Sequence, residues 1–309
     1  MLEVFPDYYD RFQCTAGDCR HSCCIGWEID VDPDKLQYYL TLPGPLGDRL
    51  RANISLDGDP HFILDDRERC PFLNQNGLCD LILELGQDSL CGICRDHPRF
   101  RNELPGRVET GLGLCCEEAA RLILGQKTPS RLVLHGQPEC ADDYIDLRDQ
   151  ALTLLRNTGL SLDFCTAAIL ESLEASLPAV TMNRWAGLLL ELEQMDPAWT
   201  ERLEALKTGW RESLLAPFDA HMASRQMEYR QFLIYLIYRH LANAGSDTDL
   251  AARGAFAVFG WQLLRALGAM EYARTGKFDF EDQVELARLF SAELEYSDEN
   301  LYILLDALC

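Results

Sequence analysis

The residue type with the clearest chemical pattern in this sequence is cysteine. Ten of the thirteen cysteines lie within residues 14–116, in four local groups: Cys14, Cys19, Cys23 and Cys24, then Cys70 and Cys79, then Cys91 and Cys94, then Cys115 and Cys116. Thiolates are preferred ligands of Zn²⁺ and of iron–sulfur clusters, and a C-x2-C turn places two sulfurs on one site. The sequence therefore predicts that these ten cysteines are metal ligands.

Two other interpretations of the cysteines stay open: a structural site that holds zinc alone, and a set of ordinary buried thiols. A reducing compartment disfavours disulfides, so a dense set of cysteines in a chain without a recognisable secretory signal indicates metal. We expect an iron–sulfur site, with zinc as the alternative. His21 and His97 lie close to cysteine groups and are further candidate ligands, although a surface or hydrogen-bonding role is more common for such histidines.

A basic segment follows the third cysteine group in an otherwise acidic chain. It consists of Arg95, His97, Arg99, Arg101 and Arg107, whereas the whole chain has a formal net charge of −22. Such residues could neutralise a thiolate cluster or hold a carboxylate group of a ligand, and a solvated face is an equal alternative. Arg95 and Arg99 are therefore the candidate cofactor-binding residues.

The net charge also limits the partners. A charge of −22 argues against general nucleic-acid binding, because phosphate contacts need a basic surface. It disfavours anionic membranes, and a basic or neutral protein partner fits it better. The most apolar stretches, residues 232–238 and 255–264, are far shorter than the ~18 residues of a membrane-spanning helix. The first twelve residues have no basic and apolar regions of a secretory signal, so we expect a cytoplasmic protein with no membrane insertion.

The elements that must position the cysteines differ along the chain. Up to about residue 120, turn signals such as DVDPD, LPGPLGD and NQNG recur and helical periodicity is sparse. Such a segment buries little apolar surface, so metal ligation would contribute to its folding. Beyond about residue 141, apolar residues at helical spacing predict eight helices, over residues 142–156, 161–176, 181–195, 197–215, 225–244, 247–274, 280–296 and 298–308.

The predicted fold is therefore mainly α. An irregular cysteine-rich metal-binding module over residues 1–130 is followed by an all-helical domain over residues 131–309, which would bind the substrate. Pro197 suits the first turn of its helix, and Thr181, Asp247 and Ser297 are the expected N-caps.

Common catalytic motifs are not found in the sequence. The radical-SAM signature C-x3-C-x2-C begins at Cys19 and Cys23, but Gly26 stands where its third cysteine would be. We find no strand followed by a glycine-rich turn, and no P-loop, H-E-x-x-H or G-x-S-x-G pattern. The motifs therefore identify no nucleotide-binding or hydrolytic site.

The cysteine strings resemble the CxxCxxCC family of zinc- or iron-chelating domains. The matching strings are Cys14…Cys19…Cys23-Cys24, Cys70-Pro71-Phe72-Leu73, Gly77-Leu78-Cys79 and Cys91…Cys94-Arg95-Asp96-His97-Pro98. A cysteine-rich head with a long helical tail is similar to the flagellin lysine-N-methylases (FliB). The segments Tyr8–Cys14 and Glu295–Leu301 also look similar to that family.

That resemblance implies methyl transfer from S-adenosylmethionine to lysine side chains of flagellin, with the cysteines holding a [4Fe–4S] cluster. The partner would be flagellin or another lysine-bearing protein. A lysine must lose its proton before it attacks a methyl group, so a methylase needs a base or a desolvating pocket. Tyr235, Tyr238 and Glu295 are the candidate catalytic residues of a substrate cleft, although tyrosines at helical spacing are more often core residues.

The alternative function is a non-enzymatic zinc- or iron-binding scaffold, or a redox-sensing module, that presents a helical surface to a partner. The dense cysteines and the lack of a known catalytic motif support it. Brown protein that binds S-adenosylmethionine would favour the enzyme, and colourless protein with stoichiometric zinc would favour the scaffold.

Overall fold

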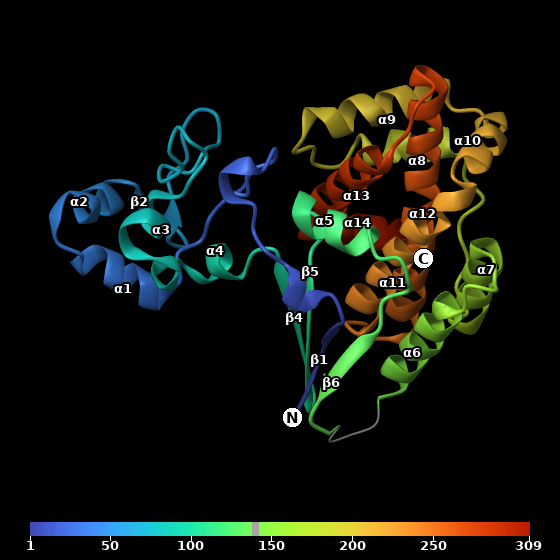
Figure 1. The fold of residues 1–309 in the computed structure, drawn as a ribbon, viewed down its shortest axis with the longest axis horizontal. Helices are drawn as coiled ribbons and strands as arrows, with labels where there is room; N and C mark the ends of the chain where they lie inside the picture. Colours follow the sequence, from blue (N-terminus) through green and yellow to red (C-terminus); the bar gives the residue numbers. More distant parts are fainter. Residues whose placement is uncertain (138–141) are drawn as a thin grey trace. The chain divides into compact units, whose positions relative to one another are not determined.

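The computed structural model describes residues 1–137 and 142–309. In this part of the chain the fold is mainly helical with a small β component (Figure 1). It divides into two compact units. We call residues 13–100 the cysteine-rich unit, and residues 1–12 together with residues 101–309 the body.

The cysteine-rich unit is built from short helices joined by turns. Its elements are η2 (Ala16–Asp18), α1 (Pro33–Thr41), α2 (Gly44–Ala52), the antiparallel pair β2 (Ile54–Ser55) and β3 (His61–Phe62), α3 (Asp80–Leu85), η3 (Gln87–Ser89) and α4 (Gly92–Asp96). Asp32 begins α1, because its carboxylate accepts the amide of Lys35 at 3.2 Å and Pro33 suits the first turn. A core of apolar side chains, Tyr39 and Phe72 among them, lies inside the unit. The unit is thus more regular than its turn-rich sequence predicts.

The body holds a four-stranded sheet with the order β4-β5-β1-β6. Its strands are β1 (Leu2–Pro6), β4 (Arg99–Leu104), β5 (Arg107–Leu112) and β6 (Leu132–His135). β1 runs parallel to β5, with Leu2 opposite Arg107, and antiparallel to β6, with Val4 opposite Leu134. The all-helical prediction for residues 131–309 is therefore wrong at β6, because pairing with a strand from the other end of the chain leaves no local pattern.

All eight predicted helices are present in the body, and most of them end earlier than predicted. They are α6 (Asp143–Arg156), α7 (Leu162–Ser172), α8 (Met182–Leu189), α9 (Pro197–Gly209), α11 (Gln226–Leu241), α12 (Asp247–Thr275), α13 (Phe280–Leu294) and α14 (Asp298–Ala307). Pro197 lies in the first turn of α9, and Thr181 and Ser297 occupy N-cap positions, as predicted. The N-cap of α12 is Ser246 rather than Asp247, because the Ser246 hydroxyl accepts an amide of the first turn.

Several short elements complete the body. They are η1 (Tyr9–Arg11), α5 (Glu117–Leu124), η4 (Glu212–Leu214), α10 (Leu215–His221) and η5 (Ala223–Arg225). Helix α11 lies at the centre and packs against α5, α6 and α12, and its side chains from residue 228 to residue 238 are buried (Figure 1). Among the residues described, no helix is both long and apolar enough to cross a membrane.

The division into units differs from the predicted boundary near residue 130. Residues 101–130 belong to the body, since β5 pairs with β1 and α5 packs on α11 and α13. Cys115 and Cys116 therefore lie in the body.

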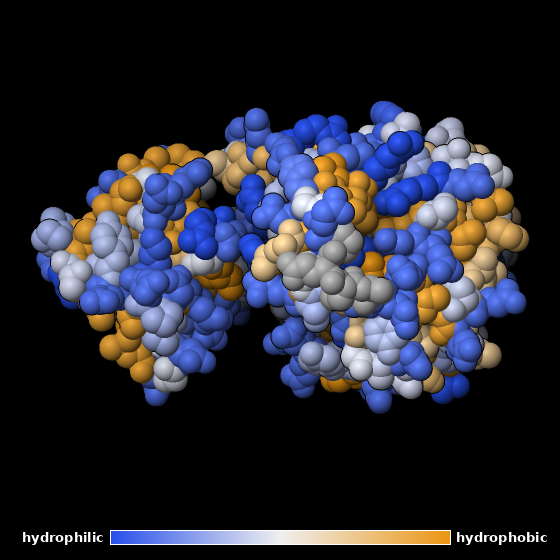
Figure 2. All heavy atoms as spheres, turned by 90° about the horizontal axis from the view of Figure 1, so that it is seen from below, coloured by the Kyte–Doolittle hydropathy of each residue, from blue (hydrophilic) through white to orange (hydrophobic). Residues whose placement is uncertain are grey.

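Hydrophobic patches reach the surface of the cysteine-rich unit (Figure 2). Exposed apolar side chains of this unit include Tyr38, Leu56, Ile63 and Leu83. A unit of this size has a limited core, so it leaves part of its apolar surface uncovered.

Candidate functional site

Five cysteine side chains of the cysteine-rich unit share one core. They are Cys24, Cys70, Cys79, Cys91 and Cys94, and each packs with the same group of apolar side chains. We call these five residues the thiol cluster. Cys70 and Cys91 are buried, and the other three are half-buried. The fold therefore gathers thiols from three of the four cysteine groups of the sequence.

Backbone hydrogen bonds hold the first two groups together. The amide of Cys70 donates to the carbonyl oxygen of Cys24 at 2.8 Å. Between Cys70 and Cys79 the chain turns at Gly77, whose φ of 71° is a conformation that favours glycine. Leu73 then pairs with Cys79 across this turn. The turn signal in this segment thus corresponds to a real turn, which returns Cys79 toward Cys70.

The third group lies at the start of α4. Cys91 occupies the N-cap position and Cys94 lies in the first turn. Asp32, which also caps α1, accepts the amide of Gly92 at 2.7 Å, so one carboxylate fixes the start of both helices. The side chains of Cys91 and Cys94 hydrogen-bond to each other. The two sulfurs of this C-x2-C turn are therefore close enough to affect each other's pKa.

Hydrogen bonding, burial and mutual repulsion set the pKa values of these thiols. Burial, and then repulsion from neighbouring thiolates, raises the pKa of Cys70 to about 12. A hydrogen bond with Cys23, opposed by burial, lowers the pKa of Cys24 to about 7. A hydrogen bond with Cys91, together with burial, raises the pKa of Cys94 far above its usual value. Each thiolate penalises the next, so several of them can be ionised together only beside a cation.

The thiol cluster fits a thiolate-bound metal by its chemistry. Zinc sites and [4Fe–4S] clusters commonly use four thiolates, and five thiols are available around this one core. In the described part of the chain, no three His, Cys, Asp or Glu side chains lie in position to hold a metal ion as they stand. Ligation would therefore require the half-buried thiols to turn toward one another.

The other predicted ligands lie outside the thiol cluster. Cys14, Cys19 and Cys23 belong to the loops around η2, where Cys14 and Cys23 are exposed. Cys115 and Cys116 are half-buried residues of the body, where burial raises the pKa of Cys115 to about 12. The structure thus brings together five of the ten predicted ligands, and the other five stay candidates.

The predicted cofactor-binding arginines lie near the end of the cysteine-rich unit. Arg95 makes two hydrogen bonds with Asp96, at 3.0 and 3.2 Å, which raise its pKa. Arg99 is exposed at the first position of β4. Burial lowers the pKa of His97 to about 4, and its ring lies 5.7 Å from that of Trp27 between centroids. His97 is therefore neutral at pH 7, and the arginines supply the positive charge of this segment.

Two of the three predicted catalytic residues belong to a buried polar network in the body. The Tyr235 hydroxyl lies 3.1 Å from both carboxylate oxygens of Glu295. The Nε2 atom of His240 lies 2.6 Å from Glu295 Oε1, and the Nε atom of Arg239 lies 3.5 Å from it. Burial opposes ionisation of Glu295, but Arg239 and His240 outweigh it and hold the pKa of this carboxyl below its usual value. The network therefore contains a buried carboxylate–guanidinium pair.

Tyr238 lies almost one turn further along α11 and has different partners. Its hydroxyl lies 2.9 Å from the carbonyl oxygen of Thr110 and 3.1 Å from that of Val4, so it connects α11 to β5 and β1. The exposed fractions of Tyr235, Tyr238 and Glu295 are 1%, 2% and 4%. A substrate cannot touch these side chains in this conformation. Their contribution to the fold is evident, and a catalytic role stays a prediction.

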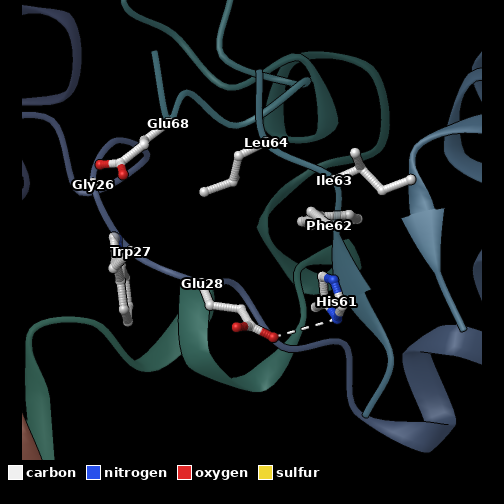
Figure 3. Close-up of a pocket in the computed structure, with 8 residues that line it drawn as sticks. All are labelled: Gly26, Trp27, Glu28, His61, Phe62, Ile63, Leu64 and Glu68. Atoms are coloured by element: carbon white, nitrogen blue, oxygen red, sulfur yellow. Dashed lines mark ion pairs between the residues drawn. The ribbon is translucent and has the colours of Figure 1, made fainter. Parts of the chain in front are cut away.

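The cysteine-rich unit also contains a hollow, and none of the residues that line it was predicted from the sequence to be a site residue (Figure 3). It has a volume of about 360 Å³, and its lining includes Trp27, Glu28, His61 and Glu68. The lining comes from residues 26–28, residues 61–64 and Glu68, which no motif connects. The one signal in the sequence is position, because the first segment follows Cys24 and the second precedes Cys70.

The body places the chain in a known family. A family model described as the FliB lysine N-methylase C-terminal domain matches residues 111–308, which is more than half of the chain. The chain belongs to this family. The matched segment contains the helices α5 to α14 and the network around Glu295, and the cysteine-rich unit lies outside it. The predicted relation to FliB is confirmed, whereas the likeness of the cysteine strings to CxxCxxCC domains stays a prediction.

Curated relatives carry related names. The lysine-N-methylase of Salmonella typhimurium is 29% identical over 133 residues, which cover 38% of this chain and 31% of that protein. The lysine-N-methylase of Salmonella choleraesuis is 28% identical over 133 residues, with the same shares. The flagellar biosynthetic protein FliU of Salmonella muenchen is 27% identical over 126 residues, which cover 38% of this chain and 75% of FliU. The chain thus spans about a third of the length of the lysine-N-methylases that it matches, and no solved structure matches it.

Proposed function

We propose that this protein is a protein-lysine N-methylase that acts on flagellin. Family membership over residues 111–308 carries the proposal. The names of the relatives support it, since two are lysine-N-methylases and the third is a flagellar biosynthetic protein. The formal charge of −22 is also suitable, because a negative surface attracts a lysine-bearing segment.

The methyl donor in this proposal is S-adenosylmethionine. Transfer forms a bond between the lysine Nζ and the methyl carbon, while the sulfonium C–S bond breaks and its electron pair stays on sulfur. The lysine must first lose a proton, and its pKa in water is about 10.4. Contact with an apolar wall lowers that value by desolvation, so the substrate lysine needs a site that removes water from its ammonium group.

We further propose that the thiol cluster holds a [4Fe–4S] cluster, with zinc as the alternative metal. Its cysteines would provide the four thiolates, and Arg95 and Arg99 of the same unit would hold a carboxylate group of the methyl donor. A bound iron–sulfur group with four thiolates would supply an electron-transfer centre, and one held by only three would supply a Lewis-acidic iron. Tyr235 and Glu295 would act by stabilising the body rather than by touching the substrate.

The decisive experiment is a methylation assay on anaerobically purified protein with flagellin and methyl-labelled S-adenosylmethionine. We expect label on flagellin lysines, located by peptide mass spectrometry, and about four iron and four sulfide per chain. Flagellin with acetylated lysines is the control and should take up no label. Metal-loaded, folded protein that transfers no methyl group to flagellin would overturn the proposal.

A metal-held scaffold without catalytic activity is the second candidate. One observation favours it: the thiols of the cluster are part of an apolar core, as in structural zinc sites, whose metal contributes directly to folding. Colourless protein with stoichiometric zinc and no methyl transfer would support this function, and iron-dependent transfer would exclude it.

A further inference from the structure

The hollow on the cysteine-rich unit combines an aromatic wall with carboxylates. In Figure 3, Trp27 and Glu68 lie on one side, His61 and the segment that follows it lie on the other, and Glu28 lies between them. The amide of Gly26 donates to the carbonyl oxygen of Glu68 at 3.0 Å, which ties the two lining segments together. The hollow is therefore held by backbone contacts as well as by side chains.

The Glu28 carboxylate is positioned by a histidine. The Nδ1 atom of His61 lies 2.8 Å from the carbonyl oxygen of Asp59 and 3.3 Å from Oε1 of Glu28. A carbonyl oxygen only accepts hydrogen bonds, so Nδ1 carries the hydrogen and donates it to Asp59, with the Glu28 carboxylate close beside it. The Glu28 side chain is 65% exposed, so its carboxylate can also reach a ligand.

The Trp27 ring is fixed as a wall by its own contacts. Its indole N–H donates to the carbonyl oxygen of Cys23 at 2.6 Å, and its ring packs near that of His97. An aromatic face attracts cations through its quadrupole, and it also covers methylene groups. A fixed ring can do both for a ligand without a large loss of side-chain freedom.

These groups select a ligand that is both cationic and aliphatic. Among the described residues that line the hollow there are two carboxylates, Glu28 and Glu68, and no lysine or arginine. Phe62 and Leu64 add apolar surface. A lysine side chain has the matching chemistry, with four methylenes and an ammonium group. The sulfonium of the methyl donor is also a cation, and carboxylates are common partners of ribose hydroxyls, so the experiment below compares the two ligands directly. The volume of about 360 Å³ lies at the lower end of the ~300–1,000 Å³ of ligand sites, which suits one side chain.

We propose that this hollow recognises the side chain of the substrate lysine in its charged form, with Glu28 as the charge partner of its ammonium group and Trp27 as its aromatic wall. The carboxylate raises the pKa of the lysine, so the hollow serves recognition, and the proton is lost in a later step. The inference rests on the proposed function, which supplies the lysine. The lining segments begin two residues after Cys24 and end two residues before Cys70. The backbone that carries these two thiols therefore also carries the lysine site.

Calorimetric binding to the metal-loaded full chain tests the site directly. The probe is N-acetyl-lysine methylamide, and the norleucine analogue, which lacks the ammonium group, is the comparison ligand. We expect saturable binding of the lysine compound alone. Glu28→Gln and Trp27→Leu should each weaken it about two- to fivefold, the range of an exposed ion pair or cation–π contact, and the double variant about tenfold. Glu84→Gln, an exposed position of the same unit outside the hollow, should bind as the wild type does.

The site fails if the folded wild type shows no saturable binding, or if the folded double variant binds the lysine compound as tightly as the wild type does. S-adenosylmethionine binding that weakens in both variants, with lysine binding unchanged, would assign the hollow to the methyl donor and also overturn the proposal. A methyl-transfer assay distinguishes failure of the lysine site from failure of the proposed function. Wild type that binds the lysine compound and methylates nothing would refute the function and leave the site standing. Methylation by Glu28→Gln with an unchanged KM for flagellin would refute the site and leave the function standing.

Discussion

Replacing Glu295 with glutamine tests whether the buried network of Tyr235, Arg239, His240 and Glu295 stabilises the body. The carboxylate faces Tyr235 at 3.1 Å, His240 at 2.6 Å and Arg239 at 3.5 Å, in a place where its own exposed fraction is 4%. Glutamine preserves the shape and one acceptor oxygen but removes the negative charge. The Arg239 guanidinium would then lose the Glu295 carboxylate from its buried surroundings.

The expected loss of stability follows from the loss of this buried ion pair. Breaking a buried ion pair by removing one partner costs about 3–5 kcal/mol. Arg239 keeps its hydrogen bond to the Tyr235 hydroxyl at 2.6 Å and its contact with the Tyr296 ring at 4.6 Å, so the lower end of that range applies. We expect Glu295→Gln to lower the free energy of unfolding of the body by about 3 kcal/mol, which for a domain of this size corresponds to roughly 6–12 °C in Tm.

Urea denaturation and thermal unfolding, followed by circular dichroism, measure this change. The matched control is Glu271→Gln, which removes a carboxylate from an exposed pair with Arg274 and should cost less than about 1 kcal/mol. The variant Arg239→Met/Glu295→Met should recover part of the loss, because it removes both charges. A Glu295→Gln protein as stable as the control, but unable to methylate flagellin, would refute the structural interpretation and restore Glu295 as a catalytic candidate.

Three further predictions concern the thiol cluster, the pH dependence of the Glu295 network, and two glycines of the body. Cys91→Ser should lose most of the metal bound per chain, whereas Cys309→Ser, at an exposed cysteine of the body, should keep it; metal analysis after reconstitution checks both. The pKa of Glu295 lies below its unfolded value of about 4.3, so its stabilisation is present above that value and is lost as pH falls through the folded pKa. Below pH ~4, wild-type stability should therefore fall more steeply than that of Glu295→Gln, and equal slopes in acid denaturation would contradict this. Gly113→Ala would place a Cβ in overlap with the hydroxyl of Tyr296, and should lower the free energy of unfolding by about 1–3 kcal/mol. Gly187→Ala, inside α8 with only ordinary contacts, should instead raise it by up to about 1 kcal/mol.

Local patterns in the sequence were sufficient for the elements whose cause is local. Apolar residues at helical spacing predicted all eight long helices of the body, because a helix that packs on a core must repeat its apolar positions. The N-cap positions at Thr181 and Ser297 and the proline at 197 follow from the same short-range chemistry. Cysteine type and spacing predicted the thiolate chemistry, although they did not separate the five residues of the thiol cluster from the other five candidates.

Tertiary structure alone decided what depends on distant segments. The boundary between the units differs from the predicted one because β1, at the start of the chain, pairs with β5 and β6, which lie more than a hundred residues later in the sequence. The same is true of the hollow, where Glu28 meets His61 although α1 and α2 lie between them in the chain and no motif connects them. Tyr235 and Tyr238 lie three residues apart on one helix, yet one joins Glu295 and the other joins the sheet. The sequence determines which side chains can do chemistry. Only the packing of segments far apart in the chain decides which of these side chains meet, because such contacts produce no periodic pattern in the sequence of either segment.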